Sequence, residues 1–374
     1  MKKEQIFSEV SYFMNFADVV AVAMSGGVDS AVAANLLKKK YSRIFGVSHY
    51  IWPDSVCCDA AALDRASDVC RNLGIPYKVL DFSNLFTSLV VDDFVAAYSA
   101  GTTPNPCVRC NERIRFSRFY EEVVKLCREE GLCADEEMPR FATGHYVRME
   151  QTADGLLLKR ALDRSKDQSY MLYRLSSRLL PAFEFPLGGM RKSEVVELAR
   201  GFGFPVSETS ESQDVCFING PYTDFIASRL GPDATPPRGV IEDTSGRVLG
   251  RHRGYIHYTV GQRKGLGLND GPWYVIGTDP ERNRVIVGRE AELPKDSCIV
   301  GDLVWHIPEP DNELQCSVML RYNSPEVPCA VKKCTEGQCE VVFEKAAVAT
   351  PGQSAVFYRN DCVIGGGIIQ KRTA

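Results

Sequence analysis

The stretch that most constrains the fold is DVVAVAMSGGVDSAVAANLLKKK, residues 18–40, where an apolar run meets a helical pattern across two adjacent glycines. Residues 18–24 predict a buried strand, and residues 30–40 predict the helix that follows it. A strand that enters a helix through a short glycine turn is the first half of a βαβ unit. Such units build a parallel sheet with helices packed against its faces.

The same alternation continues along the first half of the chain. Residues 43–52 and 76–82 predict strands, and residues 59–74 predict a helix that stops at Gly74. Residues 140–147 predict another strand, and 191–203 a helix that begins near Ser193. Strands and helices at this spacing give right-handed crossovers, so we expect an α/β domain with a parallel sheet.

The texture of the chain changes after residue 215. A Gly- and Pro-rich region comes first, and from about residue 296 short Val-, Ile- and Tyr-rich segments alternate with turns every 8 to 12 residues, the pattern of a small β-barrel. We therefore expect three domains. They are 1–214, an α/β nucleotide-binding catalytic domain; 215–292, a small central domain; and 293–374, a C-terminal β-barrel.

Composition excludes several classes of protein. No apolar run approaches the roughly 20 residues that span a bilayer, and Glu4, Glu9 and Asn15 interrupt the apolar residues of the N-terminus. We expect a cytoplasmic protein with no membrane partner. The net charge of −4 means that a nucleic acid would have to be held by local basic stretches, such as those within 238–255 and 261–265.

The glycine turn itself predicts a phosphate site. Ser25, Ser30 and the backbone N–H groups at the helix start form a nest for phosphate, which the helix dipole favours. The lysine of a Walker A loop is absent. The string SGGVDS instead resembles the PP-loop of ATP pyrophosphatases, which indicates ATP as a substrate. Asp29 is then suited to bind Mg²⁺ near the phosphates.

A second polar segment, ATGHY, ends the strand expected over 140–147. Ligands collect at the carboxyl ends of parallel strands, so Gly144 and His145 should face the same crevice as Ser25. Taken alone, His145 would be read as an ordinary strand-end histidine. The phosphate loop makes a site residue the better interpretation.

Fourteen cysteines in a chain without an export signal favour thiols, metal ligands or catalytic sulfur over structural disulfides. Cys107 and Cys110 lie on a Pro-stiffened loop before a helix expected over 112–129. The nearby arginines and the helix start should lower the pKa of their thiols. Cys216 is a third candidate, on a polar loop where the first domain ends. Spacing alone leaves open a metal clip, a disulfide and a nucleophile.

The remaining cysteines of the first domain carry no such prediction. Cys57, Cys58 and Cys70 are poorly spaced to supply the second half of a zinc site, so we read them as structural, with Cys70 buried on a helix face.

Several strings of the chain, in order, resemble the tRNA-specific 2-thiouridylase family. They are SGGVDS, TPNPCVRCNERIRF, ATGHYV, SKDQSYML, ESQDVCFI, YTVGQRKGLG, LRYN and PGQSAVFY. The resemblance implies that ATP adenylates the C2 oxygen of the wobble uridine, U34, in tRNAs for Lys, Glu and Gln. It also implies that a persulfide, received from a cysteine desulfurase or a sulfur-relay protein, supplies the sulfur.

The resemblance also assigns residues. It implies Cys216 as the persulfide carrier and Cys110 as the nucleophile that displaces AMP after sulfide release or closes a disulfide with Cys216. The ATP residues it implies are Ala23, Met24, Ser25, Gly26, Gly27, Val28, Asp29, Ser30, His49 and Gly144. The tRNA residues it implies are Asn105, Pro106, Cys107, His145, Lys166, Asp167, Gln168, Arg321, Tyr322 and Gln353.

Two positions depart from the family pattern. His49 stands where the family usually has Met, and Cys107 stands where it usually has Asp. Cys107, Cys110 and Cys216 together would offer three thiolates, the arrangement that holds a [4Fe–4S] cluster in some other tRNA thiolases. We therefore expect the persulfide route and keep the cluster as an alternative.

Two other function classes fit part of the sequence. A PP-loop amidating or ligating synthetase would use ATP but would need neither Cys110 nor Cys216. An RNA-binding regulator with a degenerate nucleotide site would bind tRNA whether or not Ser25 and Cys216 are intact.

Overall fold

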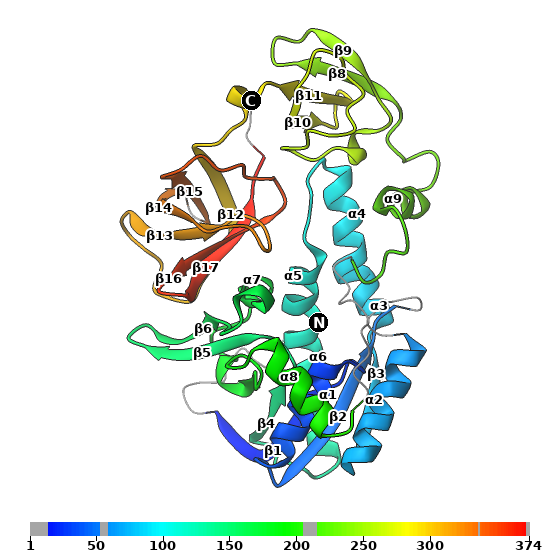
Figure 1. Ribbon diagram of the computed structural model, residues 1–374, viewed down its shortest axis with the longest axis vertical. Helices are drawn as coiled ribbons and strands as arrows, with labels where there is room; N and C mark the ends of the chain where they lie inside the picture. The colour runs from blue at the N-terminus through cyan, green and yellow to red at the C-terminus, as the bar shows by residue number, and fades with distance from the viewer. Residues whose placement is uncertain (1–13, 53–58, 205–214, 336, 372–374) are drawn as a thin grey trace. The chain divides into compact units, whose positions relative to one another are not determined.

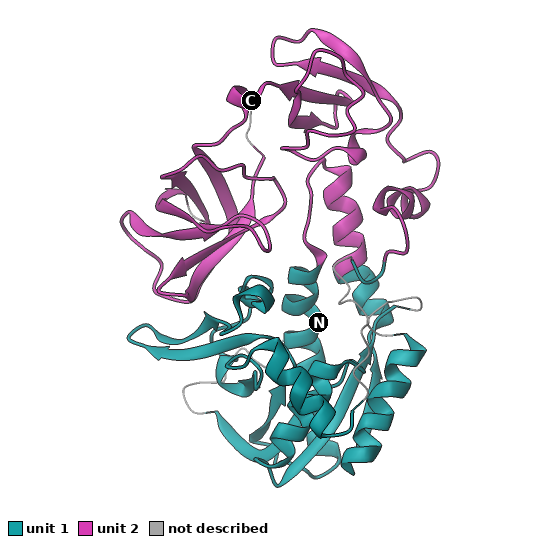
Figure 2. Cartoon of the chain, viewed as in Figure 1, with its two compact units in different colours: residues 1–89, 107–217 teal, residues 90–106, 218–374 magenta. Residues whose placement is uncertain are grey.

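The computed structural model describes residues 14–52, 59–204, 215–335 and 337–371. The chain forms two compact units, one of residues 1–89 and 107–217 and the other of residues 90–106 and 218–374 (Figure 2). The N-terminal segment and the pair Cys57 and Cys58 lie outside the described residues. Across the part that is described, no helix is both long enough and apolar enough to span a bilayer.

The first unit is built on a five-stranded parallel sheet in the order β3-β2-β1-β4-β7. Its strands are β1 Asn15–Ala23, β2 Arg43–Tyr50, β3 Tyr77–Asp81, β4 Glu137–Ala142 and β7 Phe183–Glu184. The chain winds from β1 outward to β3 and then returns to the other side of β1 with β4. The carboxyl ends of β1 and β4 therefore flank a topological switch point, where α/β proteins place their ligands. The predicted α/β class is confirmed.

Helices cover both faces of this sheet (Figure 1). α1 (Val28–Lys38), α2 (Ala60–Leu73) and α8 (Lys192–Gly201) share one apolar core with the strands, to which Val20 and Ala142 contribute. The next residue back along β4, Phe141, points the other way and meets Phe119 edge-on at a ring-centroid distance of 5.5 Å. This alternation is the period of a strand that is buried on both faces.

Cys70 is one of the buried residues of α2, as predicted, and burial raises the pKa of its thiol to about 12. A thiol held protonated in an apolar core is a packing residue. The structural interpretation of Cys70 is confirmed.

The helix expected over 112–129 starts earlier than predicted. α5 (Pro106–Cys110) continues through a π-helical segment, η2 (Asn111–Arg118), into α6 (Phe119–Glu129). Cys107 and Cys110 therefore lie in the first turns of the helix and not on a loop before it. Pro106 stands at the first helical position, where its missing N–H costs nothing and its fixed φ favours the helix.

The strand expected over 140–147 is also two elements. β4 ends at Ala142, and β5 (Val147–Thr152) pairs with β6 (Gly155–Arg160) as an antiparallel hairpin. Residues 143–146 connect them at the carboxyl edge of the sheet. Shorter helices complete this unit: α3 Ser83–Phe86 and α7 Ser169–Leu172.

The second unit contains a small sheet and a barrel. The small sheet has the order β10-β11-β8-β9, with β8 Gly239–Asp243, β9 Val248–His252, β10 Tyr274–Asp279 and β11 Arg284–Gly288. Helices α4 (Asp92–Ser99) and α9 (Tyr222–Leu230) belong to the same unit.

The barrel follows in the order β12-β15-β14-β13-β16-β17, and an antiparallel pairing of β12 with β17 closes it. Its strands are β12 Ser297–Trp305, β13 Leu314–Met319, β14 Val327–Thr335, β15 Gln338–Phe343, β16 Ser354–Arg359 and β17 Cys362–Ile369. Closure pairs both edges of the sheet. The predicted central domain and C-terminal β-barrel are confirmed.

Candidate active site

The phosphate loop lies between β1 and α1, where the sequence predicts it. The Ser25 amide donates to Ser30 Oγ at 3.2 Å, and Ser30 Oγ donates to the Gly27 carbonyl at 2.9 Å. Gly27 is the N-cap of α1, and no side chain caps the helix there. The first-turn N–H groups of α1 therefore remain available to an anion, with the helix dipole behind them.

The loop is shaped by close contact with α2. Gly26 has a φ of +71°, and a Cβ atom at this position would lie 2.2 Å from the Ala62 carbonyl oxygen. Arg65, one turn further along α2, donates to the Gly26 carbonyl at 3.3 Å. Only glycine fits where the backbone is left-handed and another backbone is this close.

Asp29 is held by two side chains from distant segments. Lys192 Nζ, at the first residue of α8, lies 2.8 and 2.7 Å from the two carboxylate oxygens. The Tyr146 hydroxyl donates to Oδ1 at 2.8 Å. Asp29 is thus the single carboxylate of the loop, and it already has a cationic partner.

The segment after β4 packs on this loop, as predicted. A Cβ on Gly144 would lie 3.0 Å from both the Asp29 carbonyl carbon and the Ser30 amide nitrogen, so the two backbones are in contact. His145 Nδ1 lies 2.8 Å from Thr143 Oγ1. Burial, together with the nearby Arg115 guanidinium, lowers the pKa of His145 to about 3, so its imidazole is neutral at physiological pH.

The helix that carries the cysteine pair reaches the same region. Arg115 Nη1 lies 3.3 Å from His145 Nε2, and the Asn111 side chain donates to the Met171 carbonyl at 3.2 Å. Cys110 is buried, whereas Cys107 is exposed. Contacts therefore run from this helix through His145 to the phosphate loop.

A charged cluster sits beside the cysteines. Glu112 accepts hydrogen bonds from Arg109 at 2.9 Å and from Arg174 at 2.6 Å. The Arg174 side chain is buried, whereas Glu112 is partly exposed. This ion pair joins the cysteine turns to the segment that follows α7.

Cys216 belongs to the same unit and is half-buried. The next residue, Phe217, packs against Phe86 with ring centroids 5.5 Å apart and against Trp52 at 6.1 Å. Trp52 follows the end of β2, so this aromatic contact anchors Cys216 near the carboxyl edge of the sheet. That is the edge at which the phosphate loop lies.

The three cysteines do not assemble a metal site. Within the described ranges, no group of three or more His, Cys, Asp or Glu side chains is arranged to hold a metal ion. Cys107, Cys110 and Cys216 are all described residues. The ligand set of the cluster alternative is therefore not formed among the described residues of this structure.

His49 lies at the end of β2, but its ring turns away from the loop. The ring is buried and stacks on Phe119, with centroids 5.0 Å apart, on the opposite face of the sheet from α1. The β2 backbone is the part of His49 nearest the edge where ligands collect.

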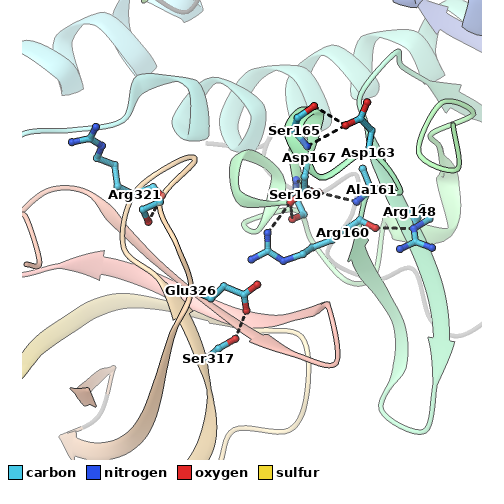
Figure 3. Close-up of polar contacts among 11 residues, drawn as sticks. Arg148, Arg160, Ala161, Asp163, Ser165, Asp167, Ser169, Ser317, Arg321 and Glu326 are labelled. Carbon is cyan, nitrogen blue, oxygen red and sulfur yellow. Dashed lines mark hydrogen bonds and ion pairs between the residues drawn. The ribbon is translucent and has the colours of Figure 1, made fainter. Parts of the chain in front are cut away.

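The segment 166–168 is mostly a structural loop (Figure 3). Asp167 is buried and accepts hydrogen bonds from the Ala161 amide at 2.8 Å and from Ser169 Oγ at 2.8 Å, and it pairs with Arg160 at 3.2 Å. The Gln168 side chain accepts from the Tyr146 amide at 2.9 Å. Lys166 and Gln168 are both half-buried.

Of the expected tRNA residues in the second unit, one has a side chain open to a ligand and another holds a loop in place. Arg321 is exposed, and its guanidinium has no partner among the described residues (Figure 3). Gln353 is buried and donates to the Thr103 carbonyl at 2.8 Å. Gln353 therefore ties the barrel to the segment that leads into Asn105 and Pro106. Tyr322 is half-buried beside Arg321.

Sequence reasoning missed Lys192, Tyr146 and the partners of Glu112. In the sequence, Lys192 stands only at an expected helix start, 163 residues from Asp29. Its one signal was a lysine at the N-terminus of a helix, where the dipole disfavours a cation unless a carboxylate or an anionic ligand is near. Tyr146 could have been found because it belongs to the same string as Gly144.

Comparison with known proteins covers nearly the whole chain. Residues 18–220 match the family described as tRNA methyl transferase HUP domain, residues 223–289 its PRC-barrel domain, and residues 295–369 an aminomethyltransferase beta-barrel domain. Among solved structures, the U34-tRNA thiolase NcsA from Methanococcus maripaludis has a TM-score of 0.34 at 19% identity, covering 58% of this chain and 66% of that chain.

Full-length relatives give the clearest result. The chain is 42% identical over 353 residues to the tRNA-specific 2-thiouridylase MnmA of Acidithiobacillus ferrooxidans, which covers 93% of this chain and 97% of that one. It is 42% identical over 366 residues to the tRNA-specific 2-thiouridylase MnmA of Geotalea uraniireducens, covering 94% of each. The chain therefore belongs to the tRNA-specific 2-thiouridylase family of tRNA-modifying transferases.

Proposed function

We propose how this member of the family converts U34 of tRNA to 2-thiouridine: ATP activates the base at the phosphate loop, and Cys216 and Cys110 deliver sulfur. The observation that supports this proposal is a series of contacts between the cysteine helix and the phosphate loop. Arg115 contacts His145, and the neighbouring Gly144 packs on Asp29. A reaction that first activates a carbonyl and then attacks it with sulfur needs both groups at one place.

In the first step, the C2 oxygen of U34 attacks the α-phosphorus of ATP. An O–P bond forms, the bond to pyrophosphate breaks, and C2 then bears AMP as a leaving group. The N–H groups at residues 25–30 bind the phosphates, with Ala23, Met24 and the β2 end around His49 flanking the nucleotide. Mg²⁺ on the phosphates would neutralise their charge, and Asp29 is the carboxylate able to join it in competition with Lys192.

In the second step, the terminal sulfur of a Cys216 persulfide attacks C2, and AMP leaves. The Cys110 thiolate then attacks Cys216 Sγ, so that the S–S bond breaks and the transferred sulfur remains on C2. The product is 2-thiouridine, with a Cys110–Cys216 disulfide that a cellular thiol reductant must reopen. A persulfide is an acidic and strongly nucleophilic form of sulfur, which suits this attack.

The partners follow from this chemistry. A cysteine desulfurase or a sulfur-relay protein loads Cys216, and the reaction takes place in the cytoplasm. The tRNA presents an unstacked U34 to Asn105, Pro106 and Cys107, since a stacked base hides its C2 carbonyl. His145, Lys166, Arg321 and Tyr322 are the proposed direct RNA contacts, and Asp167, Gln168 and Gln353 act by holding the contacting loops in place.

The proposed division of labour follows the three segments 1–214, 215–292 and 293–374, the first for ATP and sulfur chemistry and the other two for tRNA contact.

The test is thiolation in vitro with ATP, a sulfur-loaded desulfurase and an anticodon stem-loop, followed by nucleoside mass spectrometry. Cys110→Ser and Cys216→Ser should each lower 2-thiouridine formation by about 100-fold or more, because each removes a sulfur that makes or breaks a bond. Cys107→Ser is the comparison one turn from Cys110: Cys107 is exposed and, as a proposed contact of the base, makes and breaks no bond, and Ser keeps a small polar side chain there. It should retain most activity.

Pyrophosphate release separates the two steps. Cys216→Ser should still release pyrophosphate, since adenylation precedes sulfur transfer. Full 2-thiouridine formation by Cys216→Ser would overturn the persulfide assignment. Equal losses in all three cysteine variants, with iron and sulfide in the purified protein, would favour the cluster.

A further inference from the structure

The small sheet of the second unit has a second glycine-rich loop before β10, residues 261–273, which the proposed chemistry does not use. Its sequence is GQRKGLGLNDGPW, and it leads into β10. The loop borders an open cavity of about 300 Å³. The cavity is lined by Arg263, Gly265, Leu266, Gly267, Leu268, Gly271, Pro272 and Trp273.

The backbone donors in the middle of this loop are open to a ligand, although several of its carbonyl groups accept hydrogen bonds from the protein. Among the described residues, the backbone N–H groups of 263–271 donate to no protein acceptor. Gly265 and Gly267 have φ values of +76° and +65°, and the intervening Leu266 does not share the positive sign. Backbone that alternates in this way turns successive N–H groups toward one side and forms an anion-binding concavity.

Two cationic side chains beside these N–H groups would also attract an anion. Arg263 and Lys264 are exposed, and neither side chain has a partner in the described parts of the chain. Arg263 lines the cavity, whereas its neighbour Lys264 and the acidic residue of the loop, Asp270, lie outside the lining. In a chain with a net charge of −4, two adjacent unpaired cations beside free N–H groups are a local anion site.

The floor of the cavity is apolar and rigid. Leu266 and Trp273 are buried, and the Trp273 indole N–H donates to the Asn269 carbonyl at 2.8 Å. The Arg289 guanidinium stacks on the indole at 3.8 Å. A surface that combines an apolar floor with a cationic rim is suited to a sugar and its phosphate, where inorganic phosphate alone would leave the floor unused.

We propose that this loop is a backbone-binding site for the tRNA substrate, in which one nucleotide lies over Leu266 and Trp273 with its phosphate against Arg263, Lys264 and the loop N–H groups. The proposal rests on the proposed function for the identity of the RNA. It assigns the contact to phosphate and sugar and not to base edges, so it adds affinity and orientation without sequence preference.

The experiment measures binding of full-length tRNA to the full chain, without ATP, across a range of salt concentrations. Arg263→Ala/Lys264→Ala should raise the Kd roughly tenfold, and the slope of log Kd against log salt should fall by about one to two. Arg71→Ala is the charge control. Arg71 is exposed in the last turn of α2, and this turn lies at the edge of the sheet opposite the phosphate loop. Its removal should therefore leave both the Kd and the salt slope unchanged.

Phosphate-ethylation interference locates the contact. One or two phosphates should block binding of the wild type when ethylated and lose that effect in the double variant. A double variant with the Kd and salt slope of Arg71→Ala would overturn the proposal, as would an unchanged interference pattern. Thiolation at saturating tRNA is a separate readout, since its absence in the wild type would count against the proposed function while leaving the binding result intact.

Discussion

The two glycine-rich loops of this chain are built in opposite ways. The loop at residues 25–30 is closed on itself by Ser25 and Ser30, and Lys192 neutralises its carboxylate. In the loop at residues 261–273, the backbone N–H groups of 263–271 and the side chains of Arg263 and Lys264 have no protein partner among the described residues. The first is rigid before its ligand arrives, which suits a reaction that must position a phosphorus atom. The second suits a long anionic partner that supplies many weak contacts.

The largest expected difference between the loops comes from one methyl group. Gly26→Ala puts a Cβ 2.2 Å from the Ala62 carbonyl oxygen at a left-handed φ, so α2 must shift. We expect a loss of about 3 kcal/mol in unfolding free energy and at least 100-fold in ATP affinity. Gly265→Ala has the same sign of φ but no atom near enough to clash, and it should cost about 1 kcal/mol with no change for ATP.

Denaturant unfolding and calorimetry with a non-hydrolysable ATP analogue measure both variants. Equal losses of stability in the two would mean that close packing against α2 does not distinguish the loops.

The Lys192 contact gives the next largest effect. Lys192→Met leaves the Asp29 carboxylate facing the phosphates without its cation, so the ATP analogue should bind about 10- to 30-fold more weakly. Lys40→Met is the matched control, because Lys40 makes a comparable ion pair with Glu184 beyond the opposite end of α1. It should leave ATP affinity unchanged.

A double substitution sharpens this prediction. Asp29→Asn combined with Lys192→Met should recover part of the lost affinity, because the unpaired negative charge is then gone. No recovery would mean that Lys192 contacts ATP itself, and tighter ATP binding by Lys192→Met alone would contradict the electrostatic argument.

The first loop was predictable because its determinants are local. A buried strand, two glycines and a helix within 18–40 fix the turn, and the ATGHY string follows another strand whose end meets it. Lys192 was not predictable, since the contact depends on where α8 packs on α1. The early helix start at Pro106 was missed because the proline was interpreted as loop-forming, although the first helical position tolerates it.

The β5–β6 hairpin was missed for a different reason. Asp154 and Gly155 form a turn signal between two alternating segments, a pattern that indicates a hairpin, but the string ATGHYV drew the expected strand through residue 147. Local patterns thus gave the elements, and tertiary packing determined which side chains meet. The second loop carries no strand–helix frame, so its sequence alone suggested only a basic stretch.

His145, beside the first loop, makes the free energy of unfolding depend on pH. Its pKa of about 3 lies below the usual value of 6.5, so the folded state binds a proton less readily than the unfolded state between these values. The contribution of His145 to the free energy of unfolding is therefore fully present above about pH 6.5 and decreases as the pH drops toward 3. At pH 5 it has decreased by about 2 kcal/mol. The cause is burial beside Arg115.

His145→Gln removes this group and should flatten the decline. The difference in unfolding free energy between variant and wild type should change in favour of the variant from pH 8 to pH 5, as measured by denaturant titration at each pH. A difference that is constant across this range would mean that His145 is protonated alike in both states.

The smallest expected effect tests how the second loop is held. Arg289 stacks on Trp273 and donates to the Asp270 carbonyl at 2.6 Å and the Pro272 carbonyl at 3.2 Å. Arg289→Lys keeps the charge but loses the planar fork, so we expect a loss of about 1 kcal/mol or less in stability and about twofold in tRNA affinity, with an unchanged salt slope. A tenfold loss of tRNA affinity with a reduced salt slope would instead make Arg289 a phosphate contact. The second loop would then bind RNA through Arg289 as well as through Arg263 and Lys264.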